Sequence, residues 1–273
     1  MFNNITLGQY FPGDSFVHRL DPRTKILLII AIIVMILAVT SIESYCVLAG
    51  FFVFLVLLAR LNFMRLLRSV KPLWPIILLT MLIHVFSMQP RAESELLHHL
   101  QFLDLYIYKD DVIKGILMVT RIVFLILFSS ILTMTTSPLE LTDGLEKLLR
   151  PFKKFGLPAH ELAMMMTIAL RFIPTLLSET ERIMMAQSAR GMDFTSAPIM
   201  KRVKNILSII VPLFLSAFRR ADELATAMEA RCYRGGEGRT RMYQLSFSYI
   251  DSIAAIGVAF IGVAMVLAKY YGA

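Results

Sequence analysis

The stretch ILLIIAIIVMILAVT, residues 26–40, is an unbroken apolar run that decides the class of fold. With its flanks it approaches the roughly 20 residues that a helix needs to cross the hydrocarbon layer of a membrane. A second run, residues 45–59, follows directly after the short polar turn of residues 41–44. The two runs predict a pair of membrane-spanning helices joined by a tight turn.

The composition agrees with a membrane protein. Apolar residues make up 57% of the 273-residue chain and charged residues 18%, whereas soluble domains are roughly 45–50% apolar. The net charge is +8, as expected when cytoplasmic loops are rich in Lys and Arg. A chain of this length has room for several spans and one further module, but not for a separate large soluble domain.

Charge in the loops sets the expected topology. Residues 60–71 contain only basic charges and indicate a cytoplasmic loop, and a third span is expected at 72–88, with Trp74 at its interface. The net acidic residues 89–112 fit the outside, and a fourth span at 112–136 returns inward. A fifth span is expected at 245–271. This multi-pass topology in the cell membrane puts the N-terminus inside and the C-terminus outside.

Two further expectations concern the ends and the cysteines. The first 25 residues are too polar for a signal peptide, so the first apolar run should be retained as a span. Cys46 and Cys232 fall on opposite sides of the membrane in this topology, so no disulfide is expected between them.

Residues 137–243 differ from the spans because they mix apolar stretches with many Lys and Arg, and none is judged apolar and long enough to span. Ser137, Pro138 and Glu140 form a helix-start pattern. Helices are expected over about 137–155, 159–190 and 197–231, with stops at glycines or just before them. The sequence thus predicts an all-α chain with a four-span domain (1–136), a cytoplasmic module of three helices (137–243) and a last span (244–273).

The two long helices of this module are expected to cross. Small residues recur along one face of the third helix, at Ala217, Ala221 and Ala225, and such faces let helix backbones approach closely. Ordinary helix packing is the alternative reading of this pattern. Pro174 and Pro212 lie inside the two helices and should bend them.

Both long helices end in the same way, in Ala189-Arg190-Gly191 and in Ala230-Arg231-Cys232. An arginine in the last turn is favoured by the helix dipole, which alone would explain either one. A tip made of a small residue, Arg and a small residue also suits insertion into a groove, where the guanidinium can bind a carboxylate or carbonyls. Two such tips predict two copies of a similar partner.

The chain resembles the transmembrane T component of energy-coupling factor transporters. The resemblance covers most of the chain, and it is specific as a combination. The residues that carry it are Leu20-Asp21-Pro22-Arg23-Thr24-Lys25, Arg171-Phe172-Ile173-Pro174, Ala186-Gln187-Ser188-Ala189-Arg190-Gly191, Pro212-Leu213-Phe214, Arg219-Arg220-Ala221-Asp222-Glu223-Leu224-Ala225 and Ala227-Met228-Glu229-Ala230-Arg231.

The resemblance implies a non-catalytic scaffold that joins two ATP-binding-cassette ATPases, as a homo- or heterodimer, to a substrate-binding S component in the membrane. Arg190 and Arg231 would sit in the ATPase grooves, and the long helices would transmit ATPase closure for uptake of vitamins or metal ions. Cys232 departs from the Gly or Ser expected there. ATP and Mg²⁺ would be bound by the partner ATPases, so no cofactor is expected in this chain.

Other function classes find less support. No phosphate loop of the form G-x-x-x-x-G-K-[ST] occurs, and no nucleophile elbow or acid pair suggests an enzyme. We expect no catalytic residue, no metal site (His98-His99 being a weak candidate) and no nucleic-acid partner. The main alternative is the permease of an ordinary ATP-binding-cassette importer, which needs a polar cavity among the spans. Ionisable residues within spans are His84, Arg121 and Asp251; snorkelling is expected for the first two.

Overall fold

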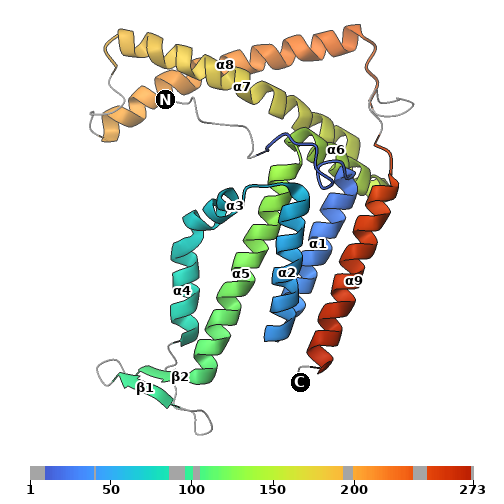
Figure 1. Ribbon diagram of the computed structural model, residues 1–273. Coiled ribbons are helices and arrows are strands. Elements are labelled where there is room, and N and C mark those ends of the chain that lie inside the picture. Colours follow the sequence, from blue (N-terminus) through green and yellow to red (C-terminus); the bar gives the residue numbers. More distant parts are fainter. Residues whose placement is uncertain are drawn as a thin grey trace. The chain divides into compact units, whose positions relative to one another are not determined.

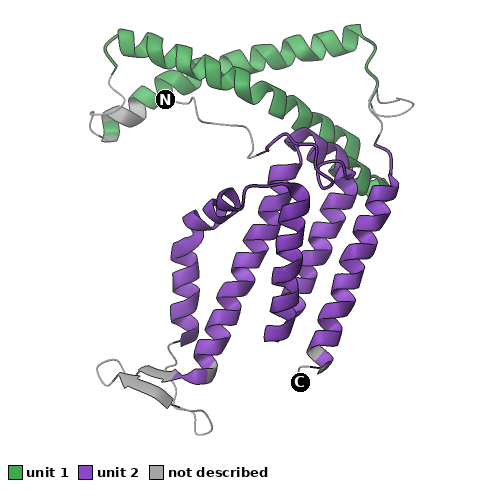
Figure 2. Ribbon diagram, viewed as in Figure 1, with its two compact units in different colours: residues 1–7, 145–244 green, residues 8–144, 245–273 purple. Residues whose placement is uncertain are grey.

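The computed structural model describes residues 10–39, 41–85, 96–100, 105–192, 199–235 and 245–271. The chain divides into two compact units (Figure 2). The first, here the bundle unit, comprises residues 8–144 and 245–273. The second, here the crossed-helix unit, contains residues 145–244. These limits lie close to the module limits of 137 and 243 expected from the sequence.

The bundle unit is built on α1 (Pro22–Ala38), α2 (Ile42–Ala59), α5 (Lys109–Thr135) and α9 (Tyr249–Tyr271). Both α1 and α2 pack against α5 and α9 (Figure 1). The predicted third span, 72–88, corresponds to η1 (Lys71–Leu73) and α4 (Trp74–Val85). The preceding α3 (Phe63–Val70) lies within residues 60–71, which were expected to form a loop, and both α3 and α4 pack on α5. Pro72 lies in η1, where a missing N–H and a fixed φ suit a change of direction.

The bundle core is largely aromatic. Phe52 packs edge-on against Phe128 with ring centroids 5.4 Å apart, and Tyr45 stacks on Phe124 at 6.3 Å. Phe128 is fully buried, whereas Leu57 on α2 is 71% exposed. Such apolar outward faces are expected where a helix is surrounded by lipid rather than by water.

Within the described residues, five helical segments are long and apolar enough to cross a membrane, but they are not the five predicted ones. Four of them are α2, α3–α4, α5 and α9, while α1, with 17 residues, is slightly shorter than these. The fifth is α7 (Ala159–Ala189), so the expectation that nothing within 137–243 is apolar and long enough was wrong. Because α1 packs against both α5 and α9, we count it as a bundle helix.

The acidic loop contains an element that was not predicted. β1 (Leu96–Leu100) pairs antiparallel with β2 (Leu105–Tyr108), with an irregularity between Leu96 and His98. The rest of the described chain is helical or irregular, so the all-α class is confirmed. The side chains of His98 and His99 lie outside the described part of the structure.

Four helical elements lead into or form the crossed-helix unit. α6 (Pro138–Leu149) begins with the predicted capping pair: Ser137 N–H donates to Glu140 Oε2 at 3.1 Å, and Glu140 N–H donates to Ser137 Oγ at 3.3 Å. The 3-10 helix η2 (Arg150–Phe155) ends at Gly156, which has a φ of 86° and so provides the predicted stop. α7 (Ala159–Ala189) and α8 (Ile199–Ala230) follow.

Candidate functional site

The two long helices α7 and α8 pack together and cross, as predicted (Figure 1). Arg220 on α8 donates through Nη2 to Glu179 Oε2 on α7 at 2.6 Å, which makes a direct ion pair between them. Both side chains are about one-third exposed, so we expect the pair to contribute little to stability. The pair marks a point at which residues of the two helices meet.

The crossing face differs in part from the predicted alanine face. Ala217 is half-buried, but Ala221 and Ala225 are exposed. The half-buried stripe of α8 runs instead through residues at a spacing of about four, namely Pro212, Leu213, Ser216, Ala217, Arg220, Leu224 and Met228. The direct bond between the two helices comes from Arg220, next to Ala221, and the role of Ala221 and Ala225 in the crossing stays a prediction. Both helices continue through their prolines, Pro174 and Pro212.

The end of α7 is a complete Schellman motif. Arg190 is the C-cap, Gly191 N–H donates to Ser188 O at 3.0 Å, and Met192 N–H donates to Gln187 O at 3.1 Å. Gly191 has a φ of 84°, in the left-handed region where a residue without a side chain is favoured. The motif holds Arg190 at the extreme end of the helix, with its side chain exposed.

The end of α8 repeats this geometry. Cys232 N–H donates to Glu229 O at 2.9 Å, and Tyr233 N–H donates to Met228 O at 3.0 Å. Arg231 therefore occupies the same C-cap position at the end of α8 that Arg190 occupies at the end of α7. Cys232 has a φ of 56°, although its side chain makes this conformation costly. The predicted tip residues Ala189, Arg190, Gly191, Ala230, Arg231 and Cys232 are all exposed. Within the described part of the chain, neither arginine makes an ion pair.

Exchanging the residues at the left-handed positions should shift the local stability of each tip. In Gly191→Ala a Cβ meets nothing within 4 Å, so the cost is backbone strain alone. We expect about 1 kcal/mol and hence roughly fivefold faster hydrogen exchange at the Met192 amide. Cys232→Gly should slow exchange at the Tyr233 amide by a similar factor. Hydrogen-exchange mass spectrometry measures both, and unchanged rates in the two variants would contradict the assigned caps.

The two tips are placed symmetrically about the crossing. Eleven residues separate Glu179 from Arg190, and eleven separate Arg220 from Arg231. At 1.5 Å per residue each segment is about 16.5 Å long, so the tips lie no more than about 33 Å apart. Figure 1 shows the C-terminal ends of both α7 and α8 above the crossing point, that of α7 at the left and that of α8 at the right.

The residue that completes each cap also reaches the other helix. Met192 Sδ accepts a hydrogen bond from Ser208 Oγ on α8 at 3.1 Å. Tyr233 Oη lies 3.5 Å from His160 Nε2 at the start of α7, and the other ring nitrogen of His160 lies 3.1 Å from Glu146 Oε1 on α6. Each tip is therefore joined by one polar contact to the first part of the opposite helix.

The α8 helix also presents an apolar stripe that nothing in the described chain covers. Phe214 and Phe218 are 61% and 54% exposed and pack edge-to-face at 4.6 Å. Exposed apolar patches of this kind mark surfaces for protein or membrane contact. The other large members of the stripe are Ile206, Leu207, Ile210, Val211 and Leu215.

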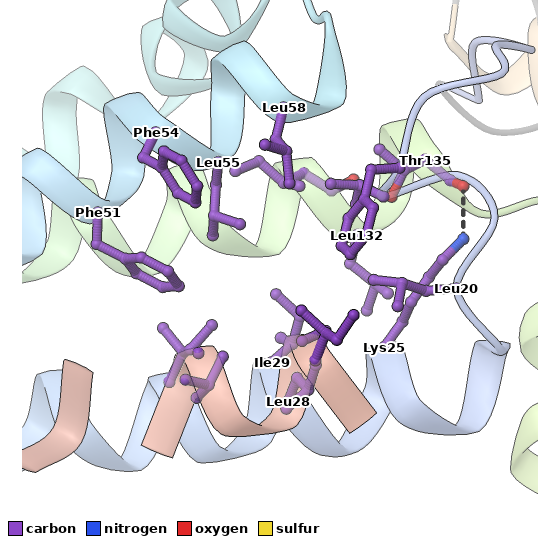
Figure 3. Close-up of a pocket in the computed structure, with 18 residues that line it drawn as sticks. Leu20, Lys25, Leu28, Ile29, Phe51, Phe54, Leu55, Leu58, Leu132 and Thr135 are labelled. Carbon is purple, nitrogen blue, oxygen red and sulfur yellow. Dashed lines mark hydrogen bonds between the residues drawn. The ribbon is translucent and has the colours of Figure 1, made fainter. Parts of the chain in front are cut away.

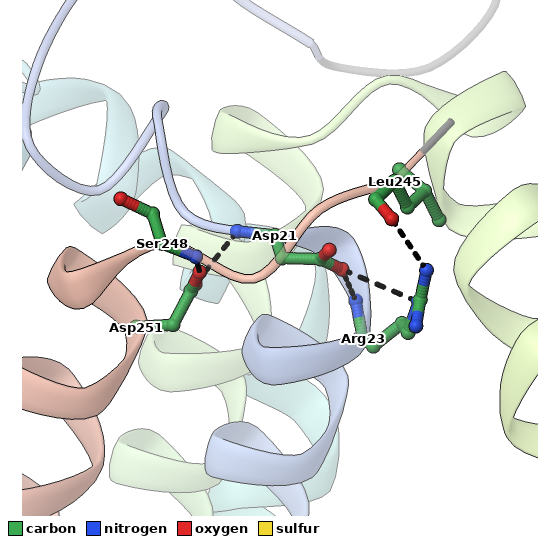
Figure 4. Close-up of polar contacts among 5 residues, drawn as sticks. All are labelled: Asp21, Arg23, Leu245, Ser248 and Asp251. Atoms are coloured by element: carbon green, nitrogen blue, oxygen red, sulfur yellow. Dashed lines mark hydrogen bonds and ion pairs between the residues drawn. The ribbon is translucent and has the colours of Figure 1, made fainter. Parts of the chain in front are cut away.

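A buried polar cluster in the bundle unit gives a role to the Leu20–Lys25 motif (Figure 4). Asp251 near the start of α9 accepts from Asp21 N–H at Oδ1 and from Ser248 N–H at Oδ2, both at 2.8 Å. Arg23 Nη2 donates to Leu245 O at 3.0 Å, and its backbone N–H donates to Asp21 Oδ1 at 2.9 Å. The start of α1 is thus bonded to the segment by which the chain enters α9.

The same motif, residues 20–25, also contacts residue 144, at which the chain leaves the bundle unit. Lys25 is buried, and its Nζ donates to His18 O and to Thr135 O, each at 3.0 Å. Gly144 approaches Pro22 so closely that a Cβ on Gly144 would lie 3.1 Å from the Pro22 Cβ. Both points at which the chain leaves and re-enters the bundle are therefore fixed by residues 21–25. The sequence motif was recognised, but no spacing in it indicated these long-range partners.

Arg121 and Asp251 are bonded within the bundle. Arg121 Nη2 donates to Val39 O at the end of α1 at 2.5 Å, and its Nε donates to Tyr45 Oη on α2 at 3.2 Å. Arg121 thus links three helices, and the expectation of snorkelling was wrong for it. His84 Nδ1 lies 2.8 Å from Thr80 O within α4. No group of three or more metal-ligating side chains occurs among the described residues.

The geometry defines a class: a multi-pass membrane protein that carries two crossed helices with paired, exposed arginine tips. Comparison with known proteins gives the family. Residues 13–242 match the CbiQ family model, described as "Cobalt transport protein". The chain is 59% identical over 256 residues to the energy-coupling factor transporter transmembrane protein EcfT of Acidaminococcus fermentans, covering 94% of this chain and 93% of the relative.

Similar agreement holds for more distant relatives. EcfT of Clostridium kluyveri is 50% identical over 94% of this chain and 93% of its own length. EcfT of Bacillus subtilis is 45% identical over 94% of this chain and 96% of its own length. The chain belongs to the CbiQ/EcfT family of energy-coupling factor transporter transmembrane proteins.

Proposed function

We propose that the chain is the non-catalytic coupling subunit that joins two ATP-binding-cassette ATPases to a substrate-binding membrane subunit for micronutrient uptake. The observation that carries the proposal is the pair of exposed arginine tips, built with the same cap and placed equally far from the crossing. A guanidinium presented at the end of a rigid helix, with small residues beside it, can enter a groove and bind a carboxylate bidentately.

The proposed ATPase partners form a dimer with one groove per subunit. Two tips on one scaffold make the second contact intramolecular, so binding of the pair is far tighter than binding of either tip. In this proposal the ATPases bind ATP and Mg²⁺, and this chain has neither a catalytic nor a cofactor-binding role. The difference between Gly191 and Cys232 leaves room for two similar but non-identical ATPases.

The substrate-binding subunit is proposed to dock on the apolar stripe of α8, which is exposed over Ile206 to Phe218. Such a surface suits an apolar partner in or at the membrane. For the crossed-helix unit to meet the ATPases, residues 145–244 must lie on the cytoplasmic side. The basic residues of segment 60–71, most of which forms α3, agree with that orientation, because Lys and Arg are retained inside.

The permease alternative is not favoured. Its substrate path would need a polar cavity among the spans, and the large cavity of the bundle is lined almost wholly by apolar side chains. A polar or charged substrate would lose its hydration there without compensation.

Co-purification tests the proposal. An affinity tag on this chain should retain two ATPase subunits and one small membrane protein from detergent extracts, and the complex should hydrolyse ATP while the chain alone does not. Reconstituted into vesicles, the complex should take up the substrate of the retained membrane protein only with ATP. Uptake by this chain and the ATPases without a third subunit would instead make the chain a permease.

A further inference from the structure

The bundle unit contains a cavity of about 420 Å³ that the proposed function does not use (Figure 3). α2 lines one side through Phe51, Phe54, Leu55 and Leu58, and α1 lines the opposite side. Residues of α5 and α9 complete the wall. The volume lies within the usual range for sites that hold a small molecule, roughly 300–1,000 Å³.

The cavity offers no free polar partner to water or to a solute. Sixteen of its eighteen lining residues are apolar or Gly, the two others being Lys25 and Thr135. Lys25 Nζ already donates to two backbone carbonyls, and Thr135 Oγ1 donates to Ile131 O at 2.8 Å. Cavities with such walls stay free of water and accept apolar molecules.

The mouth of the cavity opens onto lipid-facing surface. Phe54 and Ile253 line it and are 56% and 55% exposed, and they adjoin the outward residues Leu57 and Ile256, which are 71% and 70% exposed. α2 and α9 are both membrane-spanning by length and composition. The medium at the mouth is therefore hydrocarbon, and hydrocarbon is what can enter.

The backbone of α9 forms part of the cavity wall at an exposed glycine. Gly257 lines it, and a Cβ built on Gly257 would meet no atom within 4 Å. Gly50 on α2 also has open space at its Cβ but does not line the cavity. The two glycines give a matched pair of positions at which a side chain either fills the cavity or points elsewhere.

We propose that this cavity binds one acyl chain of a membrane lipid. The chain lies between α1 and α2 with its sides covered by α5 and α9, and its inner end is closed by Lys25 and Thr135 (Figure 3). Burial of each methylene favours binding through the hydrophobic effect, although lipid that surrounds the protein competes for the same gain. The bound chain adds dispersion contacts to cavity walls that would otherwise face empty space.

Photolabelling tests the proposal in the assembled complex. The complex is reconstituted in phosphatidylcholine–phosphatidylglycerol vesicles that contain a phosphatidylcholine with a diazirine on its acyl chain. After irradiation, peptide mass spectrometry should find label on cavity residues such as Leu28 and Leu55 as well as on the outward Leu57. Gly257→Leu should lower cavity labelling at least fivefold, while Gly50→Leu leaves it unchanged and both retain labelling of Leu57.

Three results would overturn the proposal. The first is that no cavity residue is labelled in the assembled complex. The second is that Gly257→Leu does not lower labelling of the cavity residues, and the third is that Gly50→Leu lowers it to the same extent. Ala254→Phe, at a second lining position, serves if Gly257→Leu does not assemble. Because labelling is measured whether or not uptake occurs, a complex that assembles without transporting still tests the cavity.

Discussion

The double substitution Arg190→Ala/Arg231→Ala is expected to release the ATPases from the complex and to abolish uptake. Each exposed guanidinium ends a rigid helix and has no ion-pair partner within the described chain, so it is available to a groove on another protein. Loss of a charged group from a buried interfacial pair costs about 2–5 kcal/mol. That corresponds to a roughly 30-fold or larger loss of affinity at each tip.

The single substitutions should behave differently from the double one. With one tip intact the complex keeps one contact, so Arg190→Ala or Arg231→Ala alone should retain part of the ATPase on an affinity column. Quantitative co-purification and ATP-driven uptake in vesicles measure the effect. Arg182→Ala/Arg219→Ala is the control, because it removes two exposed arginines from the same helices away from the tips. Full assembly of the double tip variant would refute the proposed role of the tips.

The largest loss of stability is expected from Asp251→Ala. Asp251 is 4% exposed and accepts the N–H groups of Asp21 and Ser248. Without the carboxylate both donors lose their partner, at about 1–3 kcal/mol for each buried group. The melting temperature in detergent should fall by roughly 5–20 °C.

Two further variants isolate the cause of that loss. Asp251→Asn keeps the size of the side chain and one acceptor oxygen, so its melting temperature should lie between those of Asp251→Ala and the unsubstituted protein. Ser252→Ala changes an exposed neighbour on the same turn and should leave the temperature unchanged. If Asp251→Ala melts at the normal temperature, the cluster around Asp21 does not hold the two ends of the bundle together.

Local patterns in the sequence predicted most of the helices and the two tips. Gly156, the Ser137–Glu140 pair and the repeated Ala-Arg-small endings act through bonds to residues near in sequence, so spacing alone indicates them. Asp251 and Arg121 could not be assigned in this way. Their partners, Asp21 and Val39, are 230 and 82 residues away in sequence, and only the packing of the bundle brings them together.

The spacing of apolar and small residues was also not sufficient to predict the contact face of α8 or to choose the membrane-spanning segments. Alanines at a spacing of four indicated a contact face, but Ala221 and Ala225 are exposed, and the neighbouring Arg220 makes the ion pair to α7. A shift of one residue rotates a helix face by about 100°, and small residues alone do not fix it. α7 meets the length and composition of a span although it pairs with α8, because few charges fall in its first half.

The Glu179–Arg220 pair lies nearer to the C-terminal tips of α7 and α8 than to the starts of these helices. Glu179 is 20 residues from the start of α7 at Ala159, and Arg220 is 21 residues from the start of α8 at Ile199. Each of the two is only 11 residues from the arginine at its own tip. For rigid helices turning about that point, one ångström of approach between the tips moves the opposite ends together by roughly two. Closing the tips also widens the sides of the cross, where Met192 bonds Ser208 and Tyr233 meets His160. Those two contacts therefore favour the arrangement in which the tips are far apart.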